Sequence, residues 1–168
     1  MLDDRQLGDL IAALAEIPHL KRVRVHTRLP VAIPQRITGE LVQLLRGSRL
    51  AAIVVLHVNH PAEIDQPVAD AIARLIDGGI PVLSQSVLLK GVNDRVEVLA
   101  SLFERLVDLR VMPYYLHQLD HVAGASHFEV PAATGINLVE ALRARLPGYA
   151  VPRYVQETVG GAYKEPLA

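Results

Sequence analysis

Cysteine and tryptophan are absent from the 168 residues, and aromatic residues make up only 4% of the chain. The lack of cysteine excludes disulfides, a thiolate nucleophile, a cysteine zinc site and a cysteine-held iron–sulfur cluster within these residues. Neither sign of charge dominates, because 17 Lys and Arg face 18 Asp and Glu, so we expect no broad binding of nucleic acid or anionic membrane. No apolar run approaches the roughly 18 residues of a membrane span, and the acidic start MLDDRQ does not resemble a signal peptide. We therefore expect a cytoplasmic protein.

Hydrophobic residues make up 51% of the chain, enough for the core of one domain. Apolar positions at helical spacing alternate with short apolar or β-branched runs, and the runs end at intervals of about 30 residues, the length of one βα unit. This pattern predicts parallel strands joined by helices. The predicted strands are 23–26, 50–56, 82–89 and 111–116, with a short extended segment at 150–155. The predicted helices are 7–17, 38–47, 68–76, 95–109 and 132–146, and the glycine-containing tail 160–164 is predicted as a loop.

Four clear strands are too few for a closed eight-stranded barrel, and the chain opens on a helix that no strand precedes. The simplest interpretation is a half-barrel, a partial (β/α) barrel of about four parallel strands with flanking helices whose amino-terminal strands are missing. A self-contained, doubly wound α/β domain is the alternative. No linker or low-complexity tract separates a second domain. We assign residues 1–149 to the partial barrel and residues 150–168 to a carboxyl-terminal segment.

Polar residues gather where the predicted strands end. Because the carboxyl ends of parallel strands meet on one face, such clusters favour a binding site there. Gln85 is the most informative of them, since an amide within a buried strand needs hydrogen-bond partners. We expect His57, Gln85 and Asp120 to open on the same face. The clusters are His26–Arg28, His57–Pro61, Gln85–Ser86 and Tyr114–His121.

Two chemistries could use these groups. A divalent metal is one, as in barrel hydrolases, although the spacing within His57-Val-Asn-His60 is not that of a helical metal motif. The other is an organic cofactor, for which Asp120 suits an ammonium group and Lys164 suits a Schiff base. The residues of the metal alternative are His57, His60, His117, Asp120 and His121. We assign no metal ligand from the sequence.

Six segments of the chain carry a resemblance to a known family. They are HTRLPVAIPQRI, LHVNHPAEI, LSQSVLLKGVND, VMPYYLHQLDHVAGASHF, GYAVPRYV and GGAYKEPL. In order and spacing they resemble the lysine 2,3-aminomutase family, radical S-adenosylmethionine (SAM) enzymes that also use pyridoxal phosphate (PLP) to convert lysine to β-lysine. The resemblance spans about residues 7–167. Segment YYLHQLDHVAGASHF is more similar to the (R)-β-lysylation branch, which acts on elongation factor P, than to the free-lysine enzymes. The resemblance implies an isomerase that contains a partial radical SAM barrel. The substrate of this isomerase would be lysine or a lysine side chain of elongation factor P.

The resemblance also implies roles for individual residues. Lys164 matches the catalytic lysine that binds PLP covalently, within the segment 150–168. Asp120 matches the aspartate that holds the substrate ammonium and is the second residue assigned to catalysis. His57 and Gln85 match positions lining the SAM pocket. Glu157 stands where the free-lysine enzymes carry a second substrate-binding aspartate, so we place it at the substrate with its role unsettled.

The main departure from the family is the missing CxxxCxxC motif, which holds a 4Fe-4S cluster. By the resemblance, this motif and the arginines that hold the PLP phosphate would precede residue 1. We therefore expect the carboxyl-terminal part of an aminomutase, inactive alone because it cannot hold the cluster. A half-barrel exposes strand edges, so we also expect self-association. A metal-dependent hydrolase and a non-catalytic half-barrel that binds a partner such as elongation factor P remain the alternatives.

Overall fold

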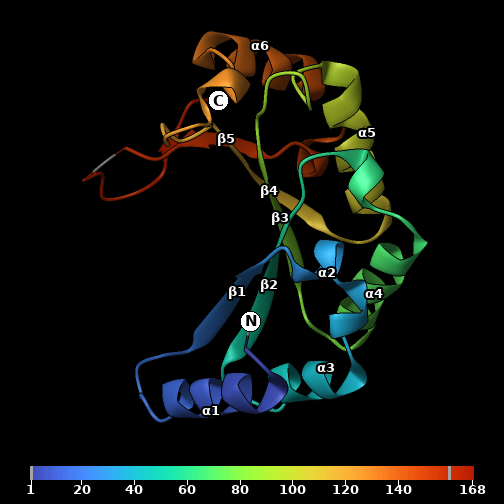
Figure 1. Cartoon of the computed structure of the whole chain (residues 1–168), viewed down its shortest axis with the longest axis vertical. Coiled ribbons are helices and arrows are strands. Elements are labelled where there is room, and N and C mark those ends of the chain that lie inside the picture. The colour runs from blue at the N-terminus through green and yellow to red at the C-terminus, as the bar shows by residue number, and fades with distance from the viewer. Residues whose placement is uncertain (1, 159) are drawn as a thin grey trace. The chain divides into compact units, whose positions relative to one another are not determined.

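The computed structural model describes residues 2–158 and 160–168 (Figure 1). Its strands follow one another in the sheet in chain order, and the sheet is mostly parallel and not closed. The predicted α/β class with flanking helices is confirmed. The strands are β1 (Arg22–Thr27), β2 (Ala51–His57), β3 (Val82–Val87), β4 (Met112–His117), β5 (Arg153–Gln156) and β6 (Glu165–Pro166). The helices are α1 (Asp4–Ala15), α2 (Leu29–Ala32), α3 (Gly39–Arg46), α4 (Gln66–Asp77), α5 (Val96–Asp108) and α6 (Ala132–Arg143).

Two compact units make up the chain. The first comprises the described residues up to Leu56 together with Ile64–Leu83, and the second comprises His57–Glu63 and Ser84–Ala168. All residues assigned to catalysis or binding from the sequence lie in the second unit. Within the part of the chain that the structure describes, no helix is long and apolar enough to cross a bilayer.

In the first unit, side-chain caps explain where the helices begin. Asp3 and Gln6 form a reciprocal capping box at α1, since each side chain accepts the other's backbone N–H (2.8 and 3.1 Å). Thr38 caps α3 by accepting the Leu41 N–H, and Asp65 caps α4 by accepting the Val68 N–H. The Arg49 guanidinium closes the other end of α1 by donating to three backbone carbonyls at 2.7 Å each. These belong to Ala15, Ile17 and Leu20.

In the second unit, α5 and α6 pack against each other (Figure 1) and cover the core. The buried residues of α5 recur every three to four positions, which is the helical period read from the sequence. They include Leu99, Leu102, Phe103 and Leu106, all 0% exposed. From α6, Gly135 allows the buried Tyr154 side chain of β5 to lie against the helix, because a Cβ at this position would overlap the tyrosine ring.

The carboxyl-terminal segment differs from expectation. β4 pairs with β5 in parallel, but β5 pairs with β6 antiparallel, with Val155 opposite Pro166. The sequence predicted a loop at 160–164 and no strand after it. Two residues of strand are too few to produce a visible alternation, so only the pairing with β5 reveals β6. The β5–β6 hairpin is what carries Lys164 back toward the sheet.

Candidate functional site

The ends of β2 and β3 bring His57 and Gln85 together. The Val58 N–H donates to the Gln85 carbonyl (3.2 Å). In a parallel ladder this bond pairs Val58 with the residue after Gln85, and therefore His57 with Gln85. Paired residues on neighbouring strands point to the same face, so the imidazole and the amide lie side by side. Both residues are half-buried.

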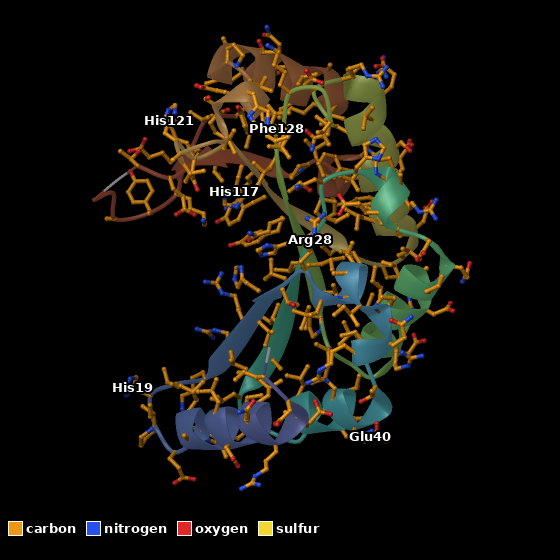
Figure 2. The ribbon with its side chains drawn as sticks, in the orientation of Figure 1. His19, Arg28, Glu40, His117, His121 and Phe128 are labelled. Atoms are coloured by element: carbon orange, nitrogen blue, oxygen red, sulfur yellow. The ribbon has the colours of Figure 1, made fainter. Side chains whose placement is uncertain are left out.

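The next strand adds two aromatic rings to this row. The Leu88 N–H donates to the His117 carbonyl (2.9 Å), which by the same geometry places Tyr115 beside Gln85. Tyr115 and His117 are two positions apart on β4 and their rings meet edge to face, with centroids 5.6 Å apart. His117, labelled in Figure 2, is only 8% exposed. From the sequence, His117 was placed only among the residues of the metal alternative and Tyr115 was given no role, although their spacing of two was a signal that they share a face.

Lys164 lies next to this row. Its Nζ is 5.8 Å from the centre of the Tyr115 ring, within the range of a cation–π contact. The same ammonium forms an ion pair with the Glu157 carboxylate. Glu157 and Lys164 also line a pocket of about 190 Å³. The other residues that line it are Thr158, Gly161, Ala162 and Tyr163. The structure therefore brings together the two carboxyl-terminal residues that the resemblance placed at the cofactor and the substrate.

Asp120 lies in a different pocket. This pocket has a volume of about 220 Å³ and lies in the loop between β4 and α6, where Figure 2 labels His121. Its lining contains two carboxylates, those of Asp120 and Glu129. Asp120 is exposed, and the structure does not place it in the pocket of Lys164. The pocket is lined by Leu119, Asp120, His121, Val122, Ser126 and Glu129.

A partly buried hydrogen-bond chain fixes the start of the Asp120 loop. The Gln118 N–H donates to the Val155 carbonyl and its Nε2 donates to the Val130 carbonyl, both at 2.8 Å. The Tyr154 hydroxyl donates to Gln118 Oε1. Burial raises the pKa of Tyr154 to about 12, so its hydroxyl stays protonated and remains a donor. The loop therefore starts from a rigid point two residues before Asp120.

The structure gives no support to the metal alternative. In residues 2–158 and 160–168, no group of three or more His, Asp or Glu side chains is arranged to hold a metal ion. His60 has a local structural role instead, because its Nδ1 accepts the Ala62 N–H (3.1 Å) at the start of a short 3-10 helix. Glu63 accepts the N–H groups of Asn59 and His60 (2.8 and 2.9 Å), which orders the same loop.

The side chains present fit two of the three implied cofactors. An imidazole beside an amide offers the donors and acceptors that the ribose hydroxyls of SAM require, and a lysine amine is the group that PLP binds. A 4Fe-4S cluster does not fit, because the chain has no cysteine to ligate its iron.

Comparison with solved structures identifies the class of fold. The chain superposes on SuiB of Streptococcus suis, solved with bound SAM, with a TM-score of 0.64 and 14% identity over 91% of this chain and 36% of that one. It also matches a radical SAM methyltransferase from Sphaerobacter thermophilus, with a TM-score of 0.54 and 22% identity over 79% of this chain and 40% of that one. The chain thus has an α/β fold found in radical SAM enzymes, while no protein-family model matches its sequence.

Sequence comparison then identifies the relatives. The chain is 47% identical over 95% of its length to L-lysine 2,3-aminomutase of Haemophilus influenzae, and 44% identical over 99% to that of Escherichia coli. It is a homologue of the L-lysine 2,3-aminomutases, and the resemblance read from the motifs is confirmed. It spans about half the length of these relatives, 47% and 49%, and corresponds to their carboxyl-terminal part.

Proposed function

We propose that this chain supplies SAM-, PLP- and substrate-binding groups of a lysine 2,3-aminomutase, an isomerase that converts lysine to β-lysine. The homology to L-lysine 2,3-aminomutases over nearly the whole chain supports this type of reaction. The observation that carries the proposal is the row of His57, Gln85 and Tyr115 with Lys164 at its end. One face of the second unit presents the side chains implied for both organic cofactors. A metal hydrolase would need a cluster of ligands instead.

His57 and Gln85 are proposed to hold the adenosyl group of SAM. An imidazole and a primary amide side by side can each donate and accept a hydrogen bond, which matches the two neighbouring hydroxyls of a ribose. Both side chains are half-buried, so these bonds form with less competition from water than on an open surface. Their strands pair directly below the site, which fixes the separation of the two side chains.

Lys164 is proposed to bind PLP, which when bound supplies an electron sink that stabilises charge or spin on the substrate. Lys164 lies between β5 and β6, next to the row of strand-end side chains, and its amine would be the group that holds PLP. In this structure, the Lys164 ammonium is held by the Glu157 carboxylate and by the Tyr115 ring. Asp120, in its own pocket, is proposed to bind the distal ammonium of the substrate lysine, since a carboxylate forms charge-assisted hydrogen bonds with an ammonium.

The chain by itself is proposed to lack turnover, because it has no cysteine to hold the cluster that starts the radical reaction. We propose a cytoplasmic location and free lysine as the substrate. The motif at Tyr114–Asp120 favours a lysine side chain of elongation factor P as the second candidate substrate.

Borohydride trapping tests the PLP assignment. The chain has three lysines, Lys21, Lys90 and Lys164, so each site of attachment gives a distinct peptide. We expect PLP followed by borohydride to label Lys164, and Lys164→Ala to abolish the label. Lys90→Ala is the matched control and should leave labelling unchanged. A label on Lys21 or Lys90 in the unaltered chain would contradict the assignment.

Calorimetric titration with SAM tests the other half of the site. We expect His57→Ala and Gln85→Ala each to raise the Kd for SAM at least about tenfold. Each substitution removes hydrogen bonds between uncharged groups, which together are worth about 1.4 kcal/mol or more. His19→Ala, an exposed residue of the first unit (Figure 2), is the control and should bind like the unaltered chain. Equal affinity in all four proteins would remove His57 and Gln85 from the SAM site.

A further inference from the structure

The turn after β3 contains a buried asparagine that neither the motifs nor the proposed function assigns. Residues Leu89–Asn93 form this turn, and the Leu89 carbonyl accepts the N–H groups of Val92 and Asn93 (3.2 and 3.1 Å). Gly91 adopts a positive φ of 73°, which favours glycine at the tip. The turn directs the Asn93 side chain back under the end of β3, where it is 0% exposed.

Asn93 satisfies three backbone groups with one side chain. Its Oδ1 accepts the Leu89 N–H (2.7 Å), and its Nδ2 donates to the carbonyls of Asn59 (2.8 Å) and Val87 (2.9 Å). One acceptor and two donors in a plane are the chemistry of a primary amide. The partners also determine its orientation, because a flipped amide would face two carbonyls with an oxygen and an N–H with a nitrogen.

The bonds of Asn93 join the loop after β2 to the end of β3. Asn59 strengthens the same junction, because its Oδ1 accepts the Val87 N–H (2.9 Å). Ser86 does so as well, because its hydroxyl donates to the Val58 carbonyl (2.5 Å). These side-chain bonds continue the β2–β3 pairing past the end of β2, along the last two residues of β3. His57 and Gln85 are the residues immediately before this junction.

We propose that Asn93 is a positioning residue for the SAM site. It holds the ends of β2 and β3 so that the imidazole of His57 and the amide of Gln85 keep the spacing needed to bind the two ribose hydroxyls. This inference rests on the proposed function of those two residues. The physical reason is that loops at strand ends have no ladder of their own, so a side chain that binds both loops sets their separation.

Two substitutions separate the parts of this role. Asn93→Leu keeps the approximate volume and removes all three hydrogen bonds. Asn93→Asp keeps the acceptor for the Leu89 N–H but places a carboxylate against the carbonyls of Asn59 and Val87. Val139→Ala is the matched control, because Val139 is also 0% exposed and lies on α6 of the same unit. It lowers stability without touching the junction.

Amide exchange and imidazole NMR measure positioning directly. In Asn93→Leu we expect the Leu89 and Val87 amides to exchange at least about tenfold faster and the His57 ring resonances to shift. Val139→Ala should leave the His57 resonances unchanged at a similar loss of melting temperature. In SAM titrations, we expect Asn93→Leu to raise the Kd at least about tenfold and Asn93→Asp to do likewise, with Val139→Ala close to the unaltered chain.

The outcomes distinguish this inference from the proposed function. If His57→Ala weakens SAM binding and Asn93→Leu does not, the positioning role is overturned while the proposed site stands. If the unaltered chain does not bind SAM, the proposed site fails on this chain. The NMR result then decides alone: unshifted His57 resonances in Asn93→Leu overturn the positioning role, and shifted ones support it for whatever ligand the site takes.

Discussion

The buried Tyr154 hydroxyl makes the stability of the second unit sensitive to alkaline pH. Burial raises its pKa from the ordinary 10.0 to about 12. The folded state thus favours the neutral phenol, while the unfolded chain ionises at the lower pH. The resulting stability is fully present below about pH 10 and is lost as the pH rises through about 12. Two pKa units correspond to about 2.7 kcal/mol.

Replacing Tyr154 by phenylalanine tests this reasoning, because the variant keeps the ring but not the hydroxyl. Gln118 Oε1 then loses its donor in a partly buried position, which costs about 1–2 kcal/mol at pH 8. The variant also loses the alkaline dependence that the hydroxyl causes. We therefore expect Tyr154→Phe to be less stable than the unaltered chain at pH 8, with a difference that shrinks above about pH 10 and changes sign by about pH 12.

Urea unfolding followed by circular dichroism, repeated at about pH 8, 10 and 12, measures this difference. Comparison of the two proteins at each pH cancels the titration of the groups they share. Tyr149→Phe is the control, because Tyr149 is 60% exposed and its substitution should leave the pH dependence of the unaltered chain in place. A stability difference that stays constant over the whole range would refute the argument from burial.

Four further predictions concern packing, capping, the cluster and assembly. Gly135→Ala should lower the free energy of unfolding by about 1–3 kcal/mol, because the new Cβ overlaps the Tyr154 ring, whereas Gly148→Ala has nothing within 4 Å and should be nearly neutral by the same urea assay. Arg49→Lys should cost about 1 kcal/mol, because an ammonium cannot reach three carbonyls as the guanidinium fork does; a melting temperature equal to that of the unaltered chain would contradict this. Reconstitution with iron and sulfide should give no stable cluster, and iron–sulfur absorbance that persists after desalting would disprove it. Sedimentation velocity should show self-association, since β1 lies at the edge of the sheet, and a monomer at high concentration would argue against it.

Local patterns in the sequence were sufficient for the order of helices and strands and for the chemistry of the strand ends. The strand predicted at 50–56 is observed as Ala51–His57, and the helix predicted at 95–109 as Val96–Asp108. Periods of two and of 3.6 residues arise within a single element, so a single sequence reveals them. The absence of cysteine likewise excludes an iron–sulfur site on these residues without any coordinates.

Boundaries and very short elements were harder to predict, because only a few residues decide them. The strand predicted at 82–89 ends at Val87, because Leu89 instead bonds to Asn93 and enters the turn. The short helix Leu29–Ala32 was not predicted, since four residues are too few to show a helical period. In both places the deciding contacts are local, but they involve too few residues to form a repeating pattern.

Only the tertiary structure decided which polar residues are neighbours. The register of β2, β3 and β4 places His57 beside Gln85 and Gln85 beside Tyr115, and the antiparallel return of β6 brings Lys164 to the same row. It also places Asp120 in another pocket than Lys164, and it makes Asn93 the junction between the loop after β2 and the end of β3. Register depends on hydrogen bonds between segments about 30 residues apart, and a shift of one residue would turn every side chain to the opposite face. The residue types at the site are therefore a property of the sequence, whereas their arrangement is a property of the fold.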